Sequence, residues 1–285
     1  MKFLAIVLAA AMLPFVGFAD GNTQALWPTS GMPDAQAGVA APYLEWSAAP
    51  AEKTGSCVII VASGDYASTD SVQALLALEE KLLAKGVTCV WLHNRPSVSS
   101  LPAYKVAWED GQRAVRLVRQ AASERGYSAD KIGVMGFSDG AHLALLLAAS
   151  SQTAAYSRVD DVDDIACNVN FAIPMSPTRV LTTGTTLDSV FAFDLKTCSM
   201  CLFHGQDDAV SSPIATTRIY RKLRTTTVAG GAKIPSEIHI IPERGHDLVS
   251  ASEFDRAIEY MCQMGFLGAL GAEVQLNSRF SSDAH

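Results

Sequence analysis

The stretch from Ile132 to Ala149 constrains the fold of this chain more than any other. It begins with the apolar run Ile132-Gly133-Val134-Met135, typical of a buried strand, and ends with 141–149, whose alanines and leucines predict a helix. Between them lies Gly136-Phe137-Ser138-Asp139-Gly140. We therefore expect Ser138 at a tight strand-to-helix turn, where side chains at the flanking glycine positions would collide with backbone. This context is typical of a nucleophile elbow, and a purely structural turn is the alternative.

Most of the remaining chain alternates between predicted strands and predicted helices. Such alternation predicts one α/β domain, with a mostly parallel sheet covered by helices on both faces. The chain has 285 residues and 49% hydrophobic content, enough for one large core, so no second domain is needed. Strands are expected at 57–62, 87–92, 132–135, 167–174, 200–204 and 237–241, with a further one near 43–46, and helices at 71–85, 107–126, 141–149, 213–223 and 252–264.

The N-terminus has the features of a secretory signal peptide. Met1-Lys2 precedes an apolar run to Val16, and Gly17-Phe18-Ala19 offers small residues for cleavage. A transmembrane anchor is the alternative, but the run is shorter than the roughly 20 residues that a spanning helix needs. We expect cleavage after Ala19 and a secreted or periplasmic protein. An irregular segment, 20–41, would precede the domain at 42–268, and a polar tail, 269–285, would follow it.

Charge and loop composition narrow the possible partners. The net charge is −7 and no Lys/Arg cluster is present, which disfavours nucleic acid. No segment after the signal peptide is apolar over a membrane-spanning length, so no membrane insertion is expected after cleavage. Two stretches, 150–165 and 177–194, are predicted to be insertions over the carboxyl edge of the sheet. The first ends in the acidic run 160–164, which lacks the spacing and glycine of a calcium loop and is predicted to be a solvated loop.

The cysteines leave two possibilities open. In an exported chain they can form disulfides, and neighbouring parallel strands could bring Cys57 near Cys89 and Cys167 near Cys198; buried unpaired thiols are the alternative. Cys198-Ser199-Met200-Cys201 has C-x-x-C spacing, but no second pair completes a zinc site, and its surroundings do not resemble a redox fold. We therefore expect no metal and no cofactor. The six cysteines are Cys57, Cys89, Cys167, Cys198, Cys201 and Cys262.

A nucleophilic serine needs a base, and the base needs a group that orients it. Of the six histidines, His246 lies in a loop after the last predicted strand, where a parallel sheet presents the same edge as the serine turn. The segment 204–210, which contains Asp207 and Asp208, follows the preceding strand. We therefore predict Ser138 as nucleophile, His246 as base and Asp208 as acid, in the chain order of an α/β-hydrolase.

These segments also carry a family resemblance. From about residue 42 to 268 the chain resembles α/β-hydrolases of the bacterial acetyl-xylan and feruloyl esterase-like group, which is related to dienelactone hydrolase and prolyl oligopeptidase. The resemblance implies the same triad, with Asp208 preferred to Asp207 because the family acid is the fifth residue counted from His204-Gly205. Its most specific parts are 109–116, 130–138, His142-Leu143, 204–208 and Gly245-His246.

The resemblance implies a secreted serine carboxylesterase that removes acetyl or other small acyl groups from plant-type carbohydrate. The oxyanion donors would be the backbone amides of Asp139 and of Gly64 or Asp65. Where the family has a run of glycines and then tyrosine, this chain has Ser63-Gly64-Asp65-Tyr66. His142 and Arg95 match family positions and are expected to have structural roles.

Two alternative functions differ in class from an esterase. Carboxylates at Asp65 and Asp139 that faced the developing negative charge would raise the barrier, so a weak or inactive hydrolase fold that binds carbohydrate or a partner is one alternative. A serine peptidase is the other, although relatives that cut peptides usually carry a large extra domain, for which this chain has no room.

Overall fold

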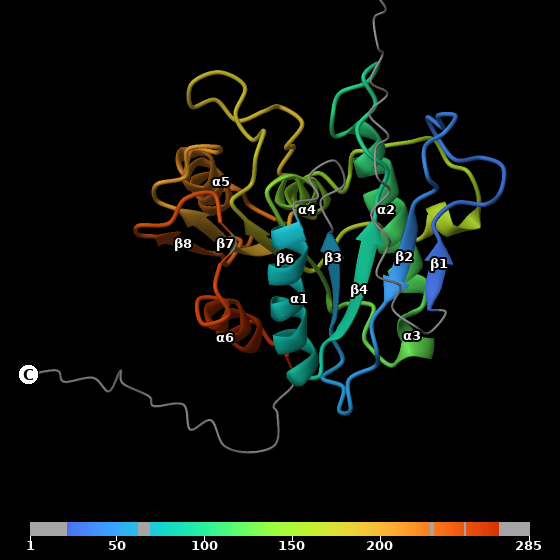
Figure 1. The fold of residues 1–285 in the computed structure, drawn as a ribbon, viewed down its shortest axis with the longest axis horizontal. Coiled ribbons are helices and arrows are strands. Elements are labelled where there is room, and N and C mark those ends of the chain that lie inside the picture. The colour runs from blue at the N-terminus through green and yellow to red at the C-terminus, as the bar shows by residue number, and fades with distance from the viewer. Residues whose placement is uncertain (1–21, 62–68, 229–230, 248, 268–285) are drawn as a thin grey trace, which may run out of the picture.

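The computed structural model describes residues 22–61, 69–228, 231–247 and 249–267, and these form one α/β domain around an eight-stranded sheet (Figure 1). The strand order is β1-β2-β4-β3-β5-β6-β7-β8. The predicted signal peptide, the polar tail and the residues Gly64 and Asp65 lie outside the described residues. The strands are β1 Thr23–Ala25, β2 Tyr43–Trp46, β3 Cys57–Val61, β4 Thr88–His93, β5 Ile132–Phe137, β6 Phe171–Met175, β7 Ser199–Gly205 and β8 Glu237–Ile241.

The sheet is parallel from β4 to β8, as the alternation of strands and helices predicts. Cys57 of β3 pairs with Thr88 of β4 and with Ile132 of β5, which places β3 and β5 at the centre of the sheet. The antiparallel pairings lie at one edge of the sheet, where β2 runs opposite to both β1 and β4. The strand β1 was not predicted, because three residues are too few to show a period of two.

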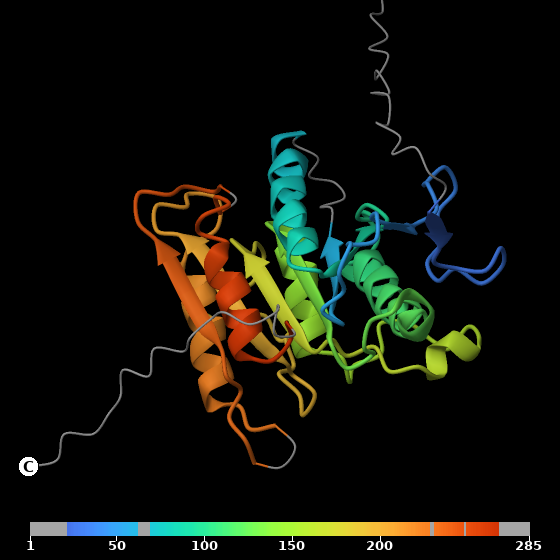
Figure 2. The same cartoon turned by 90° about the horizontal axis from the view of Figure 1, so that it is seen from below.

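Side chains that alternate along the central strands pack into two separate cores, one on each face of the sheet. Cys57, Ile59 and Val61 pack on one face of the sheet, and Val58 and Ile60 pack on the other. Helices cover both faces (Figure 2). The first face packs against α2 Lys105–Gln120, α3 Ala122–Arg125, α4 Asp139–Ala149 and α5 Ile214–Thr225, and the second against α1 Thr69–Ala84 and α6 Asp255–Gln263. None of the helices in the described ranges combines the length and the hydropathy that crossing a bilayer requires.

Two element boundaries differ from the prediction. The helix predicted at 107–126 is two helices, because α2 ends at Gln120 and the short α3 is closed by Gly126 in the left-handed conformation with φ 77°. The strand predicted from Cys167 begins only at Phe171, where pairing with Gly133 of β5 starts. In both places the apolar pattern extends beyond the residues whose backbone forms the hydrogen bonds of the helix or the strand.

Buried charges on α2 fasten the surrounding loops. Arg95, predicted as a scaffold ion-pair residue, lies just after β4 and donates from Nη2 to Asp110 (2.8 Å) and to Glu109 (3.0 Å). The Asp110 carboxylate also accepts from the indole N–H of Trp27 at 2.8 Å. One turn along α2, Arg113 donates from Nε to the carbonyl of Leu26 at 2.8 Å. The N-terminal segment is thus held against α2.

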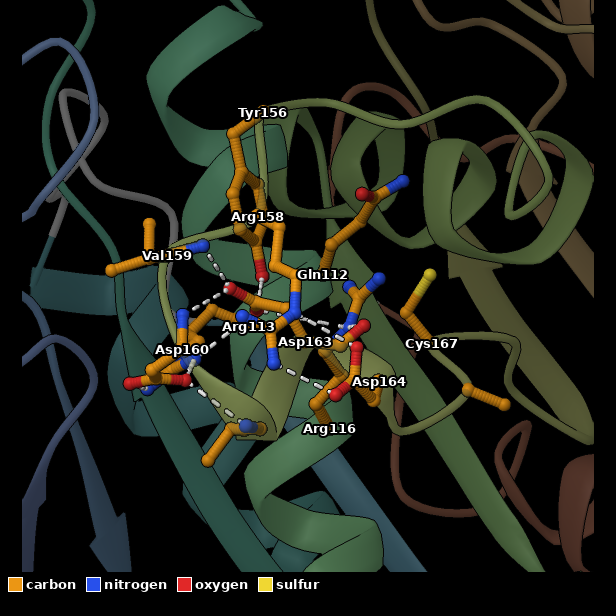
Figure 3. Close-up of polar contacts among 12 residues, drawn as sticks. Gln112, Arg113, Arg116, Tyr156, Arg158, Val159, Asp160, Asp163, Asp164 and Cys167 are labelled. Atoms are coloured by element: carbon orange, nitrogen blue, oxygen red, sulfur yellow. Dashed lines mark hydrogen bonds and ion pairs between the residues drawn. The ribbon is translucent and has the colours of Figure 1, made fainter.

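The acidic run at 160–164 is ordered rather than a solvated loop, and in this respect the prediction was wrong. It forms a 3₁₀ turn, η1 Asp161–Asp164, capped by the Asp160 side chain. Asp160 and Asp163 accept hydrogen bonds from the Arg113 guanidinium at 2.6 and 3.1 Å (Figure 3). Only Asp161 and Asp164 extend to solvent, where they pair with the exposed Arg158. The run therefore anchors the 150–165 insertion to α2.

All six cysteines are free thiols in the structure, and five of them are buried. Of the two possibilities that the sequence leaves open, the structure has the unpaired thiols. Burial raises the pKa of Cys57, Cys89 and Cys198, which keeps these thiols protonated at neutral pH.

Candidate active site

Ser138 occupies a strained turn between β5 and α4. Its φ of 57° and ψ of −117° lie outside the regions that side-chain-bearing residues favour, and its amide donates to the carbonyl of Met175 at 3.0 Å. The flanking glycines permit this turn. A Cβ on Gly136 would lie 2.5 Å from the carbonyl of Gly140, and a Cβ on Gly140 would lie 2.8 Å from the carbonyl oxygen of Val61. The structure therefore has the tight turn that the sequence predicts.

Asp208 lies in the loop after β7 and is saturated with hydrogen bonds. Its Oδ1 accepts from the amides of Val210 at 2.9 Å and Ser211 at 2.7 Å. Its Oδ2 accepts from the ring of His246 at 2.7 Å, and Nε2 of His204 lies 3.1 Å from the same oxygen. Three donors thus hold this buried carboxylate in place. Asp207, the neighbouring candidate, is exposed to solvent.

His246 lies between Asp208 and Ser138, in the loop after β8. Because a carboxylate can only accept, ring Nδ1 carries the hydrogen that bonds to Asp208. The lone pair then lies on Nε2, which is 3.0 Å from the hydroxyl oxygen of Ser138 and can accept its proton. The ring also packs on Phe137, with centroids 4.9 Å apart. The three side chains form one hydrogen-bonded chain, and the His246 side chain remains 16% exposed, so a substrate can reach it.

The topology of the sheet explains how three distant residues meet. β5, β7 and β8 are parallel, so the loops that follow them leave at the same edge of the sheet. The loops after β7 and β8 are also joined directly: the amide of Gln206 donates to the carbonyl of Ile241 at 2.8 Å, and the amide of Asp207 donates to that of Arg244 at 2.9 Å. These bonds hold Asp208 beside His246.

His204, at the end of β7, is a member of the site that the sequence analysis did not assign. Its Nε2 donates to the carbonyl of Ser211 at 2.7 Å and lies 3.1 Å from Oδ2 of Asp208, while Nδ1 accepts from Thr216 at 2.7 Å. Burial lowers the pKa of this ring, so it is neutral at pH 7 and serves as a fixed donor. Its position four residues before Asp208, at the end of a strand, was the available signal.

The Asp139 carboxylate is bound by two neighbouring side chains. It accepts hydrogen bonds from the hydroxyl of Thr178 and from Nε of Arg179, the latter at 3.2 Å. The Asp139 amide is the first of α4, where backbone N–H groups are free to bind an anion. The other predicted oxyanion donors, Gly64 and Asp65, lie outside the described residues.

A small hollow of about 40 Å³ lies beside Asp139 and Arg179. His142 forms part of its wall and is almost fully buried, with its ring near those of Tyr104 and Phe191. Burial lowers the His142 pKa to about 4, so the ring is neutral at pH 7. The remaining lining residues are Ser97, Ala103, Ala107, Leu143 and Leu146. The hollow is thus mainly apolar, with polar groups at one end.

Comparison with known proteins gives consistent matches. Residues 47–186 match the model of the BD-FAE family, a range that includes Ser138 but ends before Asp208 and His246. Among curated proteins, endo-1,4-beta-xylanase B of Butyrivibrio fibrisolvens is 32% identical over 93 residues. That match covers 32% of this chain and only 14% of the xylanase.

Solved structures match over a larger part of the fold. The acetyl ester-xyloside bifunctional hydrolase of Caldicellulosiruptor lactoaceticus has a TM-score of 0.69 at 23% identity, covering 87% of this chain and 98% of that one. Esterase 2 of Thermogutta terrifontis, in its butyrate-bound form, has a TM-score of 0.61 at 19% identity, covering 84% and 98%. At these identities the structural matches establish the fold alone.

Proposed function

The chain belongs to the α/β-hydrolase esterases and carries a BD-FAE domain at residues 47–186, and from this premise we propose that it is a serine carboxylesterase acting through Ser138, His246 and Asp208. One observation carries the proposal: the hydrogen-bonded chain from the Ser138 hydroxyl through His246 to Asp208, with distances of 3.0 and 2.7 Å. A loop serine has no structural need for a histidine that is oriented by a buried carboxylate.

In the proposed reaction, Ser138 Oγ attacks the ester carbonyl carbon while Nε2 of His246 takes the hydroxyl proton. The tetrahedral intermediate collapses when the alcohol leaves with that proton, and the acyl group stays on Ser138. Water then attacks the acyl-enzyme, again with His246 as base, and the acid is released. Asp208 stays ionised throughout and stabilises the imidazolium.

The oxyanion needs donors that are in place before it forms. We assign one to the backbone amide of Asp139, at the start of α4. The second is proposed to come from the amide of Gly64 or Asp65. Since the Asp139 carboxylate binds Thr178 and Arg179, its charge is partly neutralised.

For the substrate, we propose an acetylated or otherwise short-acylated plant-type carbohydrate. Three relatives support this choice by their names: a xylanase, an acetyl ester-xyloside hydrolase and a carbohydrate esterase from gut microbiota. Export after cleavage behind Ala19 belongs to the same proposal, because polymeric carbohydrate lies outside the cell.

A fluorophosphonate probe tests the catalytic part. We expect one adduct per chain, located on Ser138 by mass spectrometry, and none on Ser138→Ala. A folded wild-type protein that stays unlabelled would favour the alternative of an inactive, carbohydrate-binding hydrolase fold.

Hydrolysis assays test the substrate part separately. Turnover of p-nitrophenyl acetate and of acetylated xylo-oligosaccharides is expected. A protein that is labelled at Ser138 but releases no acetate from the oligosaccharides would retain the esterase proposal and reject this substrate.

A further inference from the structure

Three metal-ligating side chains meet at the edge of the sheet formed by β7 and β8. Cys201 of β7 is the register partner of Glu237 of β8, and His239 follows two residues later, so all three project from the same face. β7 and β8 are the last two strands in the sheet order, and none of the three residues takes part in the esterase site.

The positions of the ligand atoms suit a small divalent cation. The Cys201 thiol, one Glu237 oxygen and one His239 ring nitrogen all lie within 4.8 Å of one another. The Glu237 to His239 contact, Oε2 to Nε2, is 3.1 Å. Ligands at about 2.0–2.3 Å from a tetrahedral zinc ion lie roughly 3.4–3.8 Å apart, so small side-chain rotations would complete the coordination.

The three ligand side chains differ in their exposure to solvent and in how firmly packing holds them. Cys201 is fully buried and its strand fixes it, whereas the side chains of Glu237 and His239 are 36% and 26% exposed. The His239 ring stacks on Phe203 with centroids 4.9 Å apart, which fixes its plane. A cation can therefore enter from the open edge strand and find two ligands already oriented.

A buried hydroxyl near these residues also lacks a partner. Tyr260 of α6 is 2% exposed and packs in the same core as Cys201, and its hydroxyl is without a hydrogen bond to any described residue. Cys201 and Glu237 both lie near this hydroxyl. A buried polar group without a partner costs free energy, and a cation or its bound water at this place would satisfy it.

A second histidine–glutamate pair provides an internal comparison. His93 of β4 contacts Glu45 of the neighbouring strand β2 at 2.9 Å, whereas Glu237 and His239 both lie on β8. Within the part of the chain that the structure describes, only the Cys201, Glu237 and His239 group brings three such ligands together. The thiol is what distinguishes the two pairs, and a thiolate with imidazole and carboxylate selects zinc over magnesium or calcium.

We propose that Cys201, Glu237 and His239 form a binding site for Zn²⁺, with water as the remaining ligand. On binding, the Cys201 thiol releases its proton to solvent and the thiolate bonds to the metal. The ion joins β7 to the edge strand β8, which leads directly into the loop that carries His246. Zinc therefore stabilises the edge of the sheet next to the esterase site.

Cobalt(II) substitution tests this site with a readout independent of ester hydrolysis. Titration of the purified full chain, in a Cys262→Ser background that removes the exposed thiol, should produce a thiolate-to-cobalt charge-transfer band that zinc abolishes at one equivalent. The band should disappear in Cys201→Ser. Zinc affinity, measured by calorimetry, should fall by about 100-fold or more in His239→Gln and in Glu237→Gln.

The matched control is His93→Gln, which removes the histidine of the pair without a thiol and should keep the wild-type zinc affinity. Glu237 and His239 are partly exposed, so their variants test the site even if Cys201→Ser fails to fold. Absence of a charge-transfer band, or its persistence in Cys201→Ser, overturns the proposal. Unchanged zinc affinity in His239→Gln does the same.

Discussion

The esterase site and the charged residues of α2 are both buried polar networks, yet they are built for different purposes. The α2 network consists of Arg95, Glu109, Asp110, Arg113, Asp160 and Asp163. Its guanidinium groups are held from several sides: Arg113 binds Leu26, Asp160 and Asp163, and Arg95 binds Asp110 and Glu109. The arginine side chains are 4% and 2% exposed. The arginines of this network stay protonated, so they cannot take and return a proton near neutral pH.

The esterase site differs because one end of its hydrogen-bonded chain is accessible. Asp208 is saturated with donors, but the chain it begins ends at His246 Nε2 and the Ser138 hydroxyl, both open to an arriving group. Histidine can take and return a proton near neutral pH, whereas arginine cannot. Burial of charge therefore does not by itself identify a catalytic site; a titratable group at an accessible end does. If this distinction is right, each network fails in its own way when it is broken.

The largest expected effect is on catalysis. Ser138→Ala should lower kcat for p-nitrophenyl acetate by roughly 10⁴- to 10⁶-fold, since the covalent step is lost. The free energy of unfolding, measured with urea, should change by less than about 1 kcal/mol, because alanine keeps the same Cβ at the turn. A large loss of stability in this variant would contradict the separation of the two networks.

Breaking the α2 network should do the reverse. Arg113→Met removes the nearest cation of the buried Asp163 and leaves only Arg116 at 3.9 Å, and we expect the free energy of unfolding to fall by about 3–5 kcal/mol. Burial raises the Asp163 pKa, but hydrogen bonds from Tyr156, from backbone amides and from Arg113 outweigh it and hold the pKa below its ordinary value. The folded variant should keep its kcat. Arg158→Ala, which removes a solvent-exposed pair, is the control and should leave stability unchanged.

His142 should make stability depend on pH. Burial lowers its pKa to about 4, opposed by Asp139 and Asp188, whereas an unfolded histidine titrates near about 6.5. Between these values the unfolded state binds the extra proton, so the free energy of unfolding falls as pH drops from about 6.5 to 4. At pH 4.5 the loss relative to pH 7 is about 2–3 kcal/mol. Urea unfolding of His142→Gln should lack this part of the loss, and an identical pH dependence in both proteins would refute the assignment.

A smaller effect is expected from His204, which positions Asp208. His204→Phe removes the ring's hydrogen bonds to Thr216 and to the Ser211 carbonyl, which hold the loop that carries Asp208, and should lower kcat about tenfold without changing KM. His204→Gln places an amide N–H near the position of Nε2 and should recover most of the loss. If both variants lose activity equally, His204 supports the loop only by packing.

The sequence predicts the esterase site far better than the α2 network, for a physical reason. The turn at Ser138 depends on local glycines, and the sheet edge that receives Asp208 and His246 depends on alternating strands and helices, so both leave short-range patterns. The fold is confirmed, whereas the catalytic roles stay predictions. Arg113 instead finds its partners at Leu26 and at 160–163, distant segments whose approach no periodicity reveals.

The family resemblance likewise did not reveal contacts between distant segments of the chain. The motif at 109–116 was among its most specific parts, yet nothing in the motif indicated its task, which is to hold three separate segments against α2. His204 was visible at a strand end, but its contact with Asp208 depends on how the loop after β7 turns back. Pairwise contacts between loops are set by tertiary packing, and one sequence does not contain them as a pattern.

The smallest expected effect concerns Asp139, whose carboxylate is the one described acidic group next to the nucleophile in the sequence. Because it binds Thr178 and Arg179, Asp139→Asn should change kcat by less than about threefold, and the backbone amide of residue 139 is retained. Arg179→Gln exposes the carboxylate and should lower kcat more than Asp139→Asn does, while the double variant should recover. This double-mutant cycle measures the neutralisation directly. A tenfold rise in kcat for Asp139→Asn would mean instead that the carboxylate faces the oxyanion, and that this site carries an uncompensated charge like those the α2 network is built to avoid.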